Sequence, residues 1–159
     1  MYYIEGYPFG IMEYYSSDCT DHLQQPGDLL LYMSDLQMSV RNMHHDLDHV
    51  AFTIRALKVY DNPKMGNGSS LVESPRLTLF GNIESLPKHK KQSAMTCFGE
   101  KHPEAKYWWG FNDFKFYVLH VKACYYVGGY GGMNYIGWIP MNEYRQVTSS
   151  TTLEFHIQL

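Results

Sequence analysis

The chain has 159 residues, of which 45% are hydrophobic and 16% aromatic, and this length predicts a single domain with its own core. Its net charge is −3 at pH 7 without a basic stripe, which excludes the electrostatic signature of a nucleic-acid-binding protein. No run of about 20 apolar residues is present, so no membrane span is expected. The first ten residues lack the charged start and apolar stretch of a signal peptide.

The first part of the chain predicts strands on either side of one helix. The expected strands are 8–15, 29–33 and 49–57, and 16–28 is expected to be a loop. The helix is indicated by apolar residues at helical spacing, namely Leu36, Val40, Met43 and Leu47. Ser34 or Asp35 can cap its N-terminus.

The second part is richer in strand signals. After a long exposed loop at 58–74, the expected strands are 76–83, 114–127 (one strand or two), 135–139 and 151–159. Gly81 lies inside the first of these and predicts a β-bulge. A helix of about four turns is expected over 86–101, with Ser85 as cap and Pro87 in its first turn. The residues MNEYRQ, 141–146, predict a short helical turn.

These elements predict a mainly β fold, an antiparallel β-barrel of six to eight strands with two helices. No internal repeat is present. The glycine-rich stretch VGGYGGMNYIGWIP, 127–140, does not open a helix, which excludes a dinucleotide-binding loop. Its glycines, Gly128, Gly129, Gly131 and Gly132, allow positive φ angles and a tight hairpin beside large rings.

The three cysteines, Cys19, Cys97 and Cys124, form no CxxC pair and fit no zinc-site spacing. Three buried thiols in a reducing compartment are the simplest interpretation, since an odd count leaves at least one cysteine unpaired or paired between chains. A glycosylation sequon at Asn67 lies in the loop at 58–74 and points toward the secretory route.

The run 99–140 resembles the C-terminal half of the pyridoxamine 5′-phosphate oxidase-like FMN-binding split barrels, and is most similar to the CREG and heme-utilisation branches. The motifs that carry the resemblance are His102-Pro103 with Ala105, Asp113-Phe114, Val127-Gly128-Gly129-Tyr130-Gly131 and Trp138-Ile139. The match covers about 5–146 of one domain spanning 1–159. The loop at 58–74 lies where CREG-type proteins carry an insertion. Members usually have a helix and a first strand before the segment that corresponds to Pro8-Phe9-Gly10, so we expect either a truncated chain or a barrel completed differently.

The resemblance places Ser34, Arg41 and Asn42 at the flavin phosphate of members that bind FMN. Hydroxyl and arginine groups at the start of a helix suit such a phosphate. The alternative is structural: Ser34 caps the helix, and Arg41 pairs with a carboxylate such as that of Asp48. Tyr130 and Trp138 can wall the flavin ring, with the core or a dimer interface as the alternative.

Heme is a second cofactor to consider, since the heme-utilisation branch implies a C-terminal histidine ligand. His156 is the candidate axial ligand, whereas His102 belongs to the HP-x-A motif and is expected to be structural. No metal site is expected, and the absence of any bound cofactor is an equally open alternative.

No catalytic residue is assigned, because no triad or carboxylate pair can be recognised from spacing. The leading hypothesis is therefore a CREG-like homodimer that acts as a non-catalytic or weakly catalytic binding module for a protein partner in the secretory or endolysosomal route. The alternative is an FMN-dependent oxidoreductase of the same fold, and a heme-binding protein is the third candidate. The two leading hypotheses share a fold, so fold alone does not separate them.

Overall fold

The computed structural model describes residues 9–55, 75–129 and 134–149 of the chain. The strands are β1 (Tyr14–Ser16), β2 (Leu29–Ser34), β3 (Val50–Arg55), β4 (Arg76–Ser85), β5 (Phe114–Val127) and β6 (Ile136–Ile139). The α-helices are α1 (Met38–Met43), α2 (Lys91–Lys101) and α3 (Met141–Ser149). Three 3₁₀ segments complete the described elements: η1 (Thr20–His22), η2 (Lys88–Lys90) and η3 (Pro103–Trp108).

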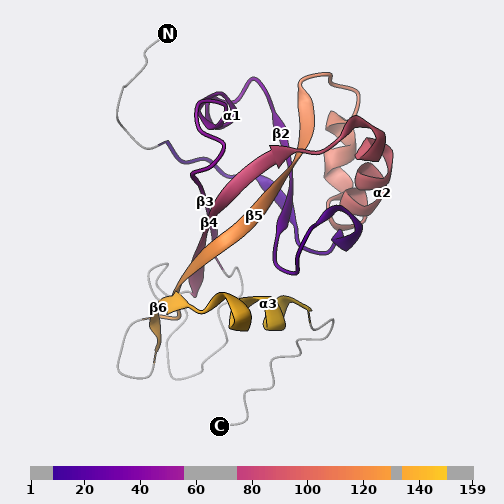
Figure 1. Ribbon diagram of the computed structural model, residues 1–159. Helices are drawn as coiled ribbons and strands as arrows, with labels where there is room; N and C mark the ends of the chain where they lie inside the picture. The colour runs from indigo at the N-terminus through magenta and orange to yellow at the C-terminus, as the bar shows by residue number, and fades with distance from the viewer. Residues whose placement is uncertain (1–8, 56–74, 130–133, 150–159) are drawn as a thin grey trace, which may run out of the picture.

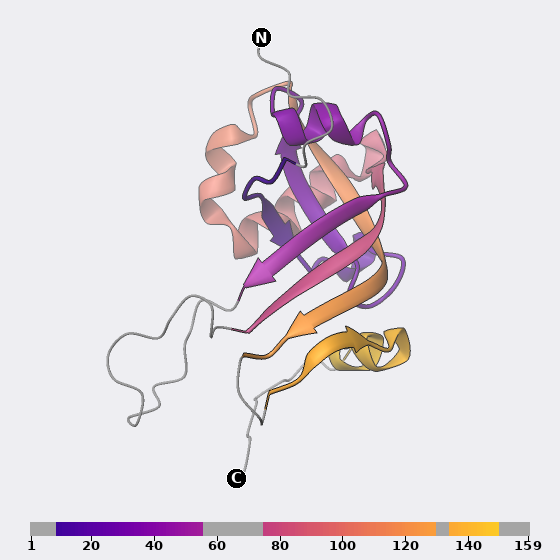
Figure 2. The same cartoon turned by 90° about the vertical axis from the view of Figure 1, so that its left-hand side faces the viewer.

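All described strands join one antiparallel sheet in the order β1-β2-β5-β4-β3, and β6 pairs with the far end of β5. The sheet curls into a half-barrel around the long, bent β5, with α2 against its outer side and α3 near β6 (Figure 1). The view from the side shows β3, β4 and β5 crossing in sequence in front of β2 (Figure 2). The predicted mainly β barrel is therefore confirmed.

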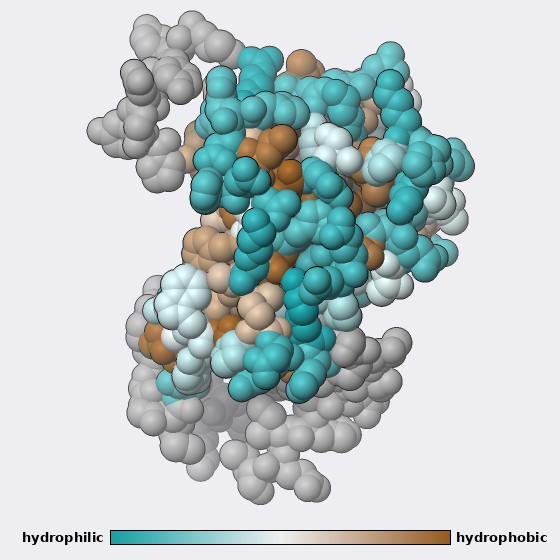
Figure 3. Space-filling model, in the orientation of Figure 1, coloured by the Kyte–Doolittle hydropathy of each residue, from teal (hydrophilic) through white to brown (hydrophobic). Residues whose placement is uncertain are grey.

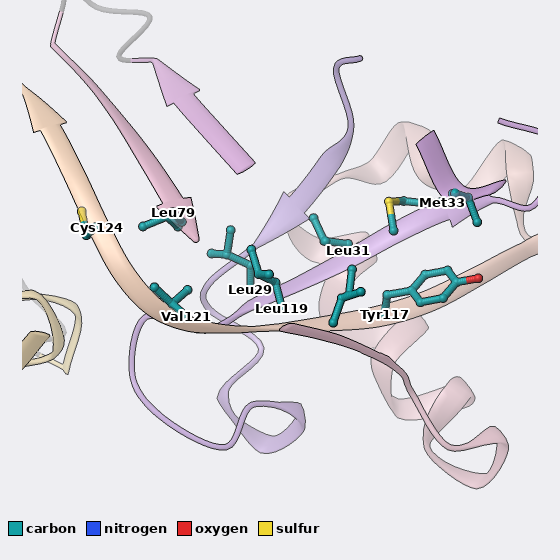
Figure 4. Packing of buried hydrophobic residues seen from close by; sticks show 10 residues of the cluster. Leu29, Leu31, Met33, Leu79, Tyr117, Leu119, Val121 and Cys124 are labelled. Carbon is teal, nitrogen blue, oxygen red and sulfur yellow. The ribbon is translucent and has the colours of Figure 1, made fainter. Parts of the chain in front are cut away.

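The central strands β2 and β5 are buried on both faces. Inside the half-barrel the core is formed by Leu29, Leu31, Met33, Val40, Leu79, Ile83, Tyr117, Leu119, Val121 and Cys124, most of which Figure 4 labels. On the other face, Leu30, Tyr32, Phe116 and Val118 pack against Ala94 and Phe98 of α2. Burial on both sides explains why 29–33 is a continuous apolar run and not an alternating one.

The predicted β-bulge is confirmed at Gly81. Phe80 pairs with Ala123 while Gly81 pairs with Val121, so Lys122 of β5 is the extra residue. A Cβ on Gly81 would lie 1.9 Å from the carbonyl oxygen of His120, so the close approach of the two strands requires glycine. The bulge reverses which side chains of β5 face inward, and this keeps apolar residues inside the half-barrel through the bend.

Several predicted boundaries were wrong for tertiary reasons. The strand predicted over 8–15 is reduced to β1, since only its end finds a partner in β2. Ser85 is not a helix cap, because it is the last residue of β4 and pairs with Tyr117. The turn predicted over 141–146 extends into the longer helix α3. The loop at 58–74 and the strand predicted at 151–159 lie outside the described residues.

The expectation of three free thiols was also wrong. Cys19, just before η1, forms a disulfide with Cys97 of α2, 78 residues away in the sequence. Cys124 is free and buried in the half-barrel. Sequence spacing could not reveal this pair, because only the docking of α2 on the sheet brings the two cysteines together. Within the described ranges, no helix has the length and apolar character that crossing a membrane requires.

Candidate functional site

The turn between β2 and α1 holds the best-defined polar cluster among the sequence-predicted site residues. Ser34 ends β2 and still pairs with Phe114, so its side chain is only 5% exposed. Its hydroxyl donates to the carboxylate of Asp113 and accepts from the backbone N–H of Leu36 at 3.1 Å. The Ser34 hydroxyl is thus fully engaged within the protein.

Asp35 adds a second carboxylate to this cluster. It accepts hydrogen bonds from the ammonium group of Lys115 and, at 3.0 Å, from the hydroxyl of Tyr117. Partial burial acts to raise the pKa of Asp35, but these two hydrogen bonds outweigh burial and lower it below the usual value. Burial and the same contact raise the pKa of Tyr117. The cluster therefore holds a charged carboxylate and a neutral phenol at neutral pH.

Helix α1 does not present its N-terminus to Ser34 in the predicted way. The helix begins at Met38, three residues later than expected, with Gln37 at its N-cap position. The Gln37 side chain turns back and accepts from the backbone N–H of Ser34 at 3.1 Å. The prediction that Ser34 or Asp35 caps α1 was therefore wrong, since both belong to the turn that leads into the helix.

The other two residues predicted at a phosphate are exposed on α1. The Arg41 guanidinium lies 3.5 Å from the backbone carbonyl oxygen of Asp35, and no contact between Arg41 and Asp48 is present in the described structure. Asn42 faces solvent. Arg41 and Ser34 thus flank the same turn, but only Ser34 is fixed by several partners.

A second feature is the outer face of the sheet beyond α2, which we call the aromatic face. Phe80, Tyr125 and Trp138 lie on it, with the Trp138 ring 5.6 Å from the Phe80 ring and 5.2 Å from the Tyr125 ring. Trp138 is 58% exposed, whereas Phe80 and Tyr125 are half-buried. Brown and pale surfaces gather where Figure 1 draws β4, β5 and β6 (Figure 3). Tyr130, the other predicted ring residue, lies outside the described residues.

The two described ends of the glycine-rich stretch lie where β5 ends and β6 begins, and these strands pair antiparallel. The backbone N–H of Gly128 donates to the carbonyl oxygen of Tyr135 at 2.9 Å, and Gly129 has a φ of 138°. Gly131 and Gly132 lie outside the described residues. The antiparallel register of β5 and β6 places Trp138 opposite Tyr125.

The histidine candidates are only partly described. His102 contacts the backbone carbonyl oxygen of Tyr15 through Nε2 at 2.7 Å, and its ring packs on Phe98, so it links α2 to β1. His156 and Asn67 lie outside the described residues. Within residues 9–55, 75–129 and 134–149, no group of three or more His, Cys, Asp or Glu residues could hold a metal ion.

Sequence reasoning missed a buried ionic network around Asp28, which is 1% exposed and directly precedes β2. Its carboxylate accepts from the backbone N–H of Val121 at 3.1 Å and from Arg145 of α3 at 3.2 Å, and the ring Nδ1 of His120 lies at 3.2 Å. Arg145 also donates to the carbonyl oxygen of Val121. The available signal was a carboxylate directly before a fully apolar run.

This network lies where β5 changes partners. One edge of β5 pairs with β2 up to Leu119 and with β6 from Cys124 onward. Val121 lies between them, and its N–H and C=O are bonded by Asp28 and Arg145 in place of a strand. We call this network the Asp28 clip. It provides hydrogen-bond partners for the backbone of Val121, at the point where the edge of β5 is paired with neither β2 nor β6.

Comparison with known proteins gives a family and a set of similar folds. The chain matches the family model described as CREG, beta-barrel, over residues 1–146. A comparison with curated proteins gave no significant match. Among solved structures, a heme-binding protein from Mycobacterium smegmatis is 26% identical with a TM-score of 0.58, over 79% of this chain and 47% of that chain.

A second similar structure is the protein Atu2129 from Agrobacterium tumefaciens, described as of unknown function. It is 19% identical with a TM-score of 0.61, over 83% of this chain and 51% of that chain, and this likeness concerns the fold alone. The chain thus spans about half the length of these two proteins.

Proposed function

Because the chain belongs to the CREG β-barrel family, we propose that it is a dimeric binding module without redox catalysis of its own. The observation that carries this proposal is that the polar side chains of the β2–α1 turn are hydrogen-bonded to other protein groups. The Ser34 hydroxyl, which the resemblance places at a flavin phosphate, donates to Asp113. Asp35, next to it, adds a second carboxylate held by Lys115 and Tyr117.

A phosphate at this turn would meet the negative charge of Asp113, the carboxylate that already accepts from Ser34. If it accepted from Ser34, its oxygens would lie about 5 Å from the carboxylate of Asp113, and repulsion there amounts to about 3 kcal/mol at an effective dielectric constant of 20. The nearby Lys115 ammonium already pairs with Asp35, so its charge is largely compensated. This arrangement supports a module that does not retain flavin through the Ser34 turn.

The aromatic face supports the dimer in this proposal. Trp138, Tyr125 and Phe80 form a contiguous aromatic group in which Trp138 is 58% exposed and the other two rings are half-buried. Exposed apolar patches of this kind mark interfaces in soluble proteins. A second copy of the chain, placed against this face, would bury Trp138. In this proposal the Trp138 ring contacts the second chain, whereas in the alternative hypothesis it contacts the flavin ring.

The disulfide supports the secretory or endolysosomal route. Structural disulfides persist in oxidising compartments and are rare in the cytosol. The Cys19–Cys97 bond joins distant parts of the chain and is largely buried, which is typical of a structural bond. In that route a glycan at Asn67 and a protein partner are part of the proposal, and peptide mapping of secreted protein would test the glycan.

The cofactor question is tested by an absorbance spectrum of the purified protein, before and after addition of FMN and of hemin, followed by gel filtration. We expect no flavin band to remain with the protein. A flavin spectrum retained at one equivalent would refute the proposal and favour the FMN-dependent oxidoreductase. In that case Ser34→Ala and Arg41→Ala should weaken binding, and Lys106→Ala serves as a control at an exposed site away from the turn.

Heme binding is the second candidate, because a similar solved structure is a heme-binding protein at 26% identity. A Soret band that survives gel filtration after hemin addition would support it. His156→Ala should then abolish the band if that residue is the axial ligand. Loss of the band in a His102→Ala variant alone would instead assign the ligand to His102.

Light scattering coupled to gel filtration tests the dimer. We expect the mass of two chains for the wild type, and of one chain for Trp138→Glu. Tyr107→Glu is the matched control, because Tyr107 is 82% exposed on η3, outside the aromatic face. A monomeric wild type would refute the dimer, and a dimer that persists in Trp138→Glu would move the interface elsewhere.

A further inference from the structure

The Cys19–Cys97 disulfide borders a cavity between η1 and α2. The cavity has a volume of about 490 Å³, and both cysteines line it. Volumes of this size accommodate small organic ligands. His22, 9% exposed, lines the same cavity, and its Nδ1 has no hydrogen-bond partner in the described structure. The disulfide therefore borders a cavity that several charged side chains also line, and Cys97 is the less buried of its two cysteines.

We propose that this disulfide is a modification site, at which small cationic thiols exchange with the protein in its folded state. The two sulfur atoms are not equivalent. Cys19 is 2% exposed, whereas Cys97 of α2 is half-buried and packs at the margin of the core cluster that contains Cys19. Because exchange requires access to the attacked sulfur, the incoming thiolate attacks Sγ of Cys97.

The exchange step is balanced without any further oxidant. The thiolate forms a bond to Sγ of Cys97 as the Cys19–Cys97 bond breaks, and Cys19 leaves as a thiolate. Solvent in the cavity supplies the proton that Cys19 takes up. The product is a mixed disulfide on Cys97 with a free thiol at Cys19, and a second thiol can release the first as a small disulfide.

The charges around the cavity select the class of thiol. The carboxylates that line it are Asp18, Asp21 and Glu100, and Lys90 is the lining ammonium group. Lys101 pairs with Asp18 at 2.9 Å, so three negative and two positive charges leave a net charge of −1. A thiol that carries an amine and no carboxylate is attracted, and glutathione, with its two carboxylates, is repelled.

The test uses the oxidised wild-type protein in native buffer, incubated with cysteamine or with glutathione and then mapped by mass spectrometry. Rates are expressed per thiolate. We expect a cysteamine adduct on Cys97, formed about two- to fivefold faster than the glutathione adduct at low salt, with a difference that shrinks as salt is added. Buried Cys124 should stay unmodified and serves as an internal control.

Two variants at exposed helix and loop positions, Glu100→Gln and Asp21→Asn, should reduce the preference for cysteamine without altering the fold. An adduct on Cys19, or equal rates for the two thiols, would overturn the proposal. So would modification that begins only in urea, because this would show that the disulfide reacts in the unfolded chain alone. These outcomes do not depend on whether the protein binds flavin or forms a dimer.

Discussion

Replacing Asp28 with Asn tests whether the Asp28 clip stabilises the fold at the point where β5 changes its pairing from β2 to β6. The substitution keeps one carbonyl oxygen but removes the charge that faces Arg145 and His120. We expect it to lower the free energy of unfolding by about 3 kcal/mol. This is the lower end of the cost of removing one partner of a buried ion pair and leaving the other charge unpaired. The lower end applies because Arg145 keeps the carbonyl oxygens of Pro26 and Val121 as partners.

Asp28→Ala should cost more, about 5 kcal/mol, because the backbone N–H groups of Val121 and Gln25 then lose their acceptor as well. For a chain of this size, a loss of about 3 kcal/mol corresponds to a melting temperature lower by about 6–12 °C. Arg145→Met should cost about 2–4 kcal/mol, since the buried carboxylate keeps its other partners.

The assay is urea unfolding followed by circular dichroism, for the wild type, Asp28→Asn, Arg145→Met and the double variant. We expect the double variant to be more stable than the sum of the single effects predicts, by about 1–2 kcal/mol, because the two residues interact directly. Arg55→Met, at an exposed position of β3, is the control and should stay within about 0.5 kcal/mol of the wild type. Single effects below 0.5 kcal/mol with full additivity would refute this account of the clip.

Three further predictions concern the disulfide, the bulge and the acid response. Reduction of Cys19–Cys97 should lower stability by about 4–5 kcal/mol, the loop-closure value for 78 residues, and reductant should leave the melting curve of a double alanine variant unchanged. Gly81→Ala should cost about 3 kcal/mol, because its Cβ would collide with a carbonyl oxygen of β5, whereas Gly110→Ala, with open space, should be near neutral in the same urea assay; equal effects would contradict the collision. Since the pKa of Asp35 is lowered, its contribution is present above the unfolded pKa of about 3.9 and lost as pH falls through the folded value. Wild type and Asp35→Asn should therefore differ in stability at pH 6 and converge as the pH falls through the folded pKa of Asp35. A difference that stays constant with pH would show that ionisation of Asp35 plays no part.

Much of the architecture follows from local patterns. The continuous apolar run 29–33 predicted a buried strand, and the alternation in 76–83 predicted a strand with one inward face. The glycine inside that strand predicted the bulge that the structure shows at Gly81. These features depend on residues close together in sequence, so side-chain periodicity and the absence of a Cβ are enough to indicate them.

The candidate site depended more on distant contacts. The sequence predicted Ser34 at the end of a strand and the start of a helix, but it did not indicate that the Ser34 hydroxyl would donate to Asp113. These residues are 79 positions apart and meet only because β2 and β5 pair in a particular register. The predicted phosphate site therefore appears in the structure as a turn whose polar groups bond to one another.

The sequence by itself determined the class of fold, the positions of most strands along the chain and the family resemblance. Only the tertiary structure decided which polar groups are paired, that Cys19 joins Cys97, and that Asp28 and Arg145 bond the backbone of Val121. The physical reason is that hydrophobic periodicity is a local property of the chain. Partner choice for a buried charge or thiol is set by strand register and helix docking, which bring together residues about 80 to 120 positions apart.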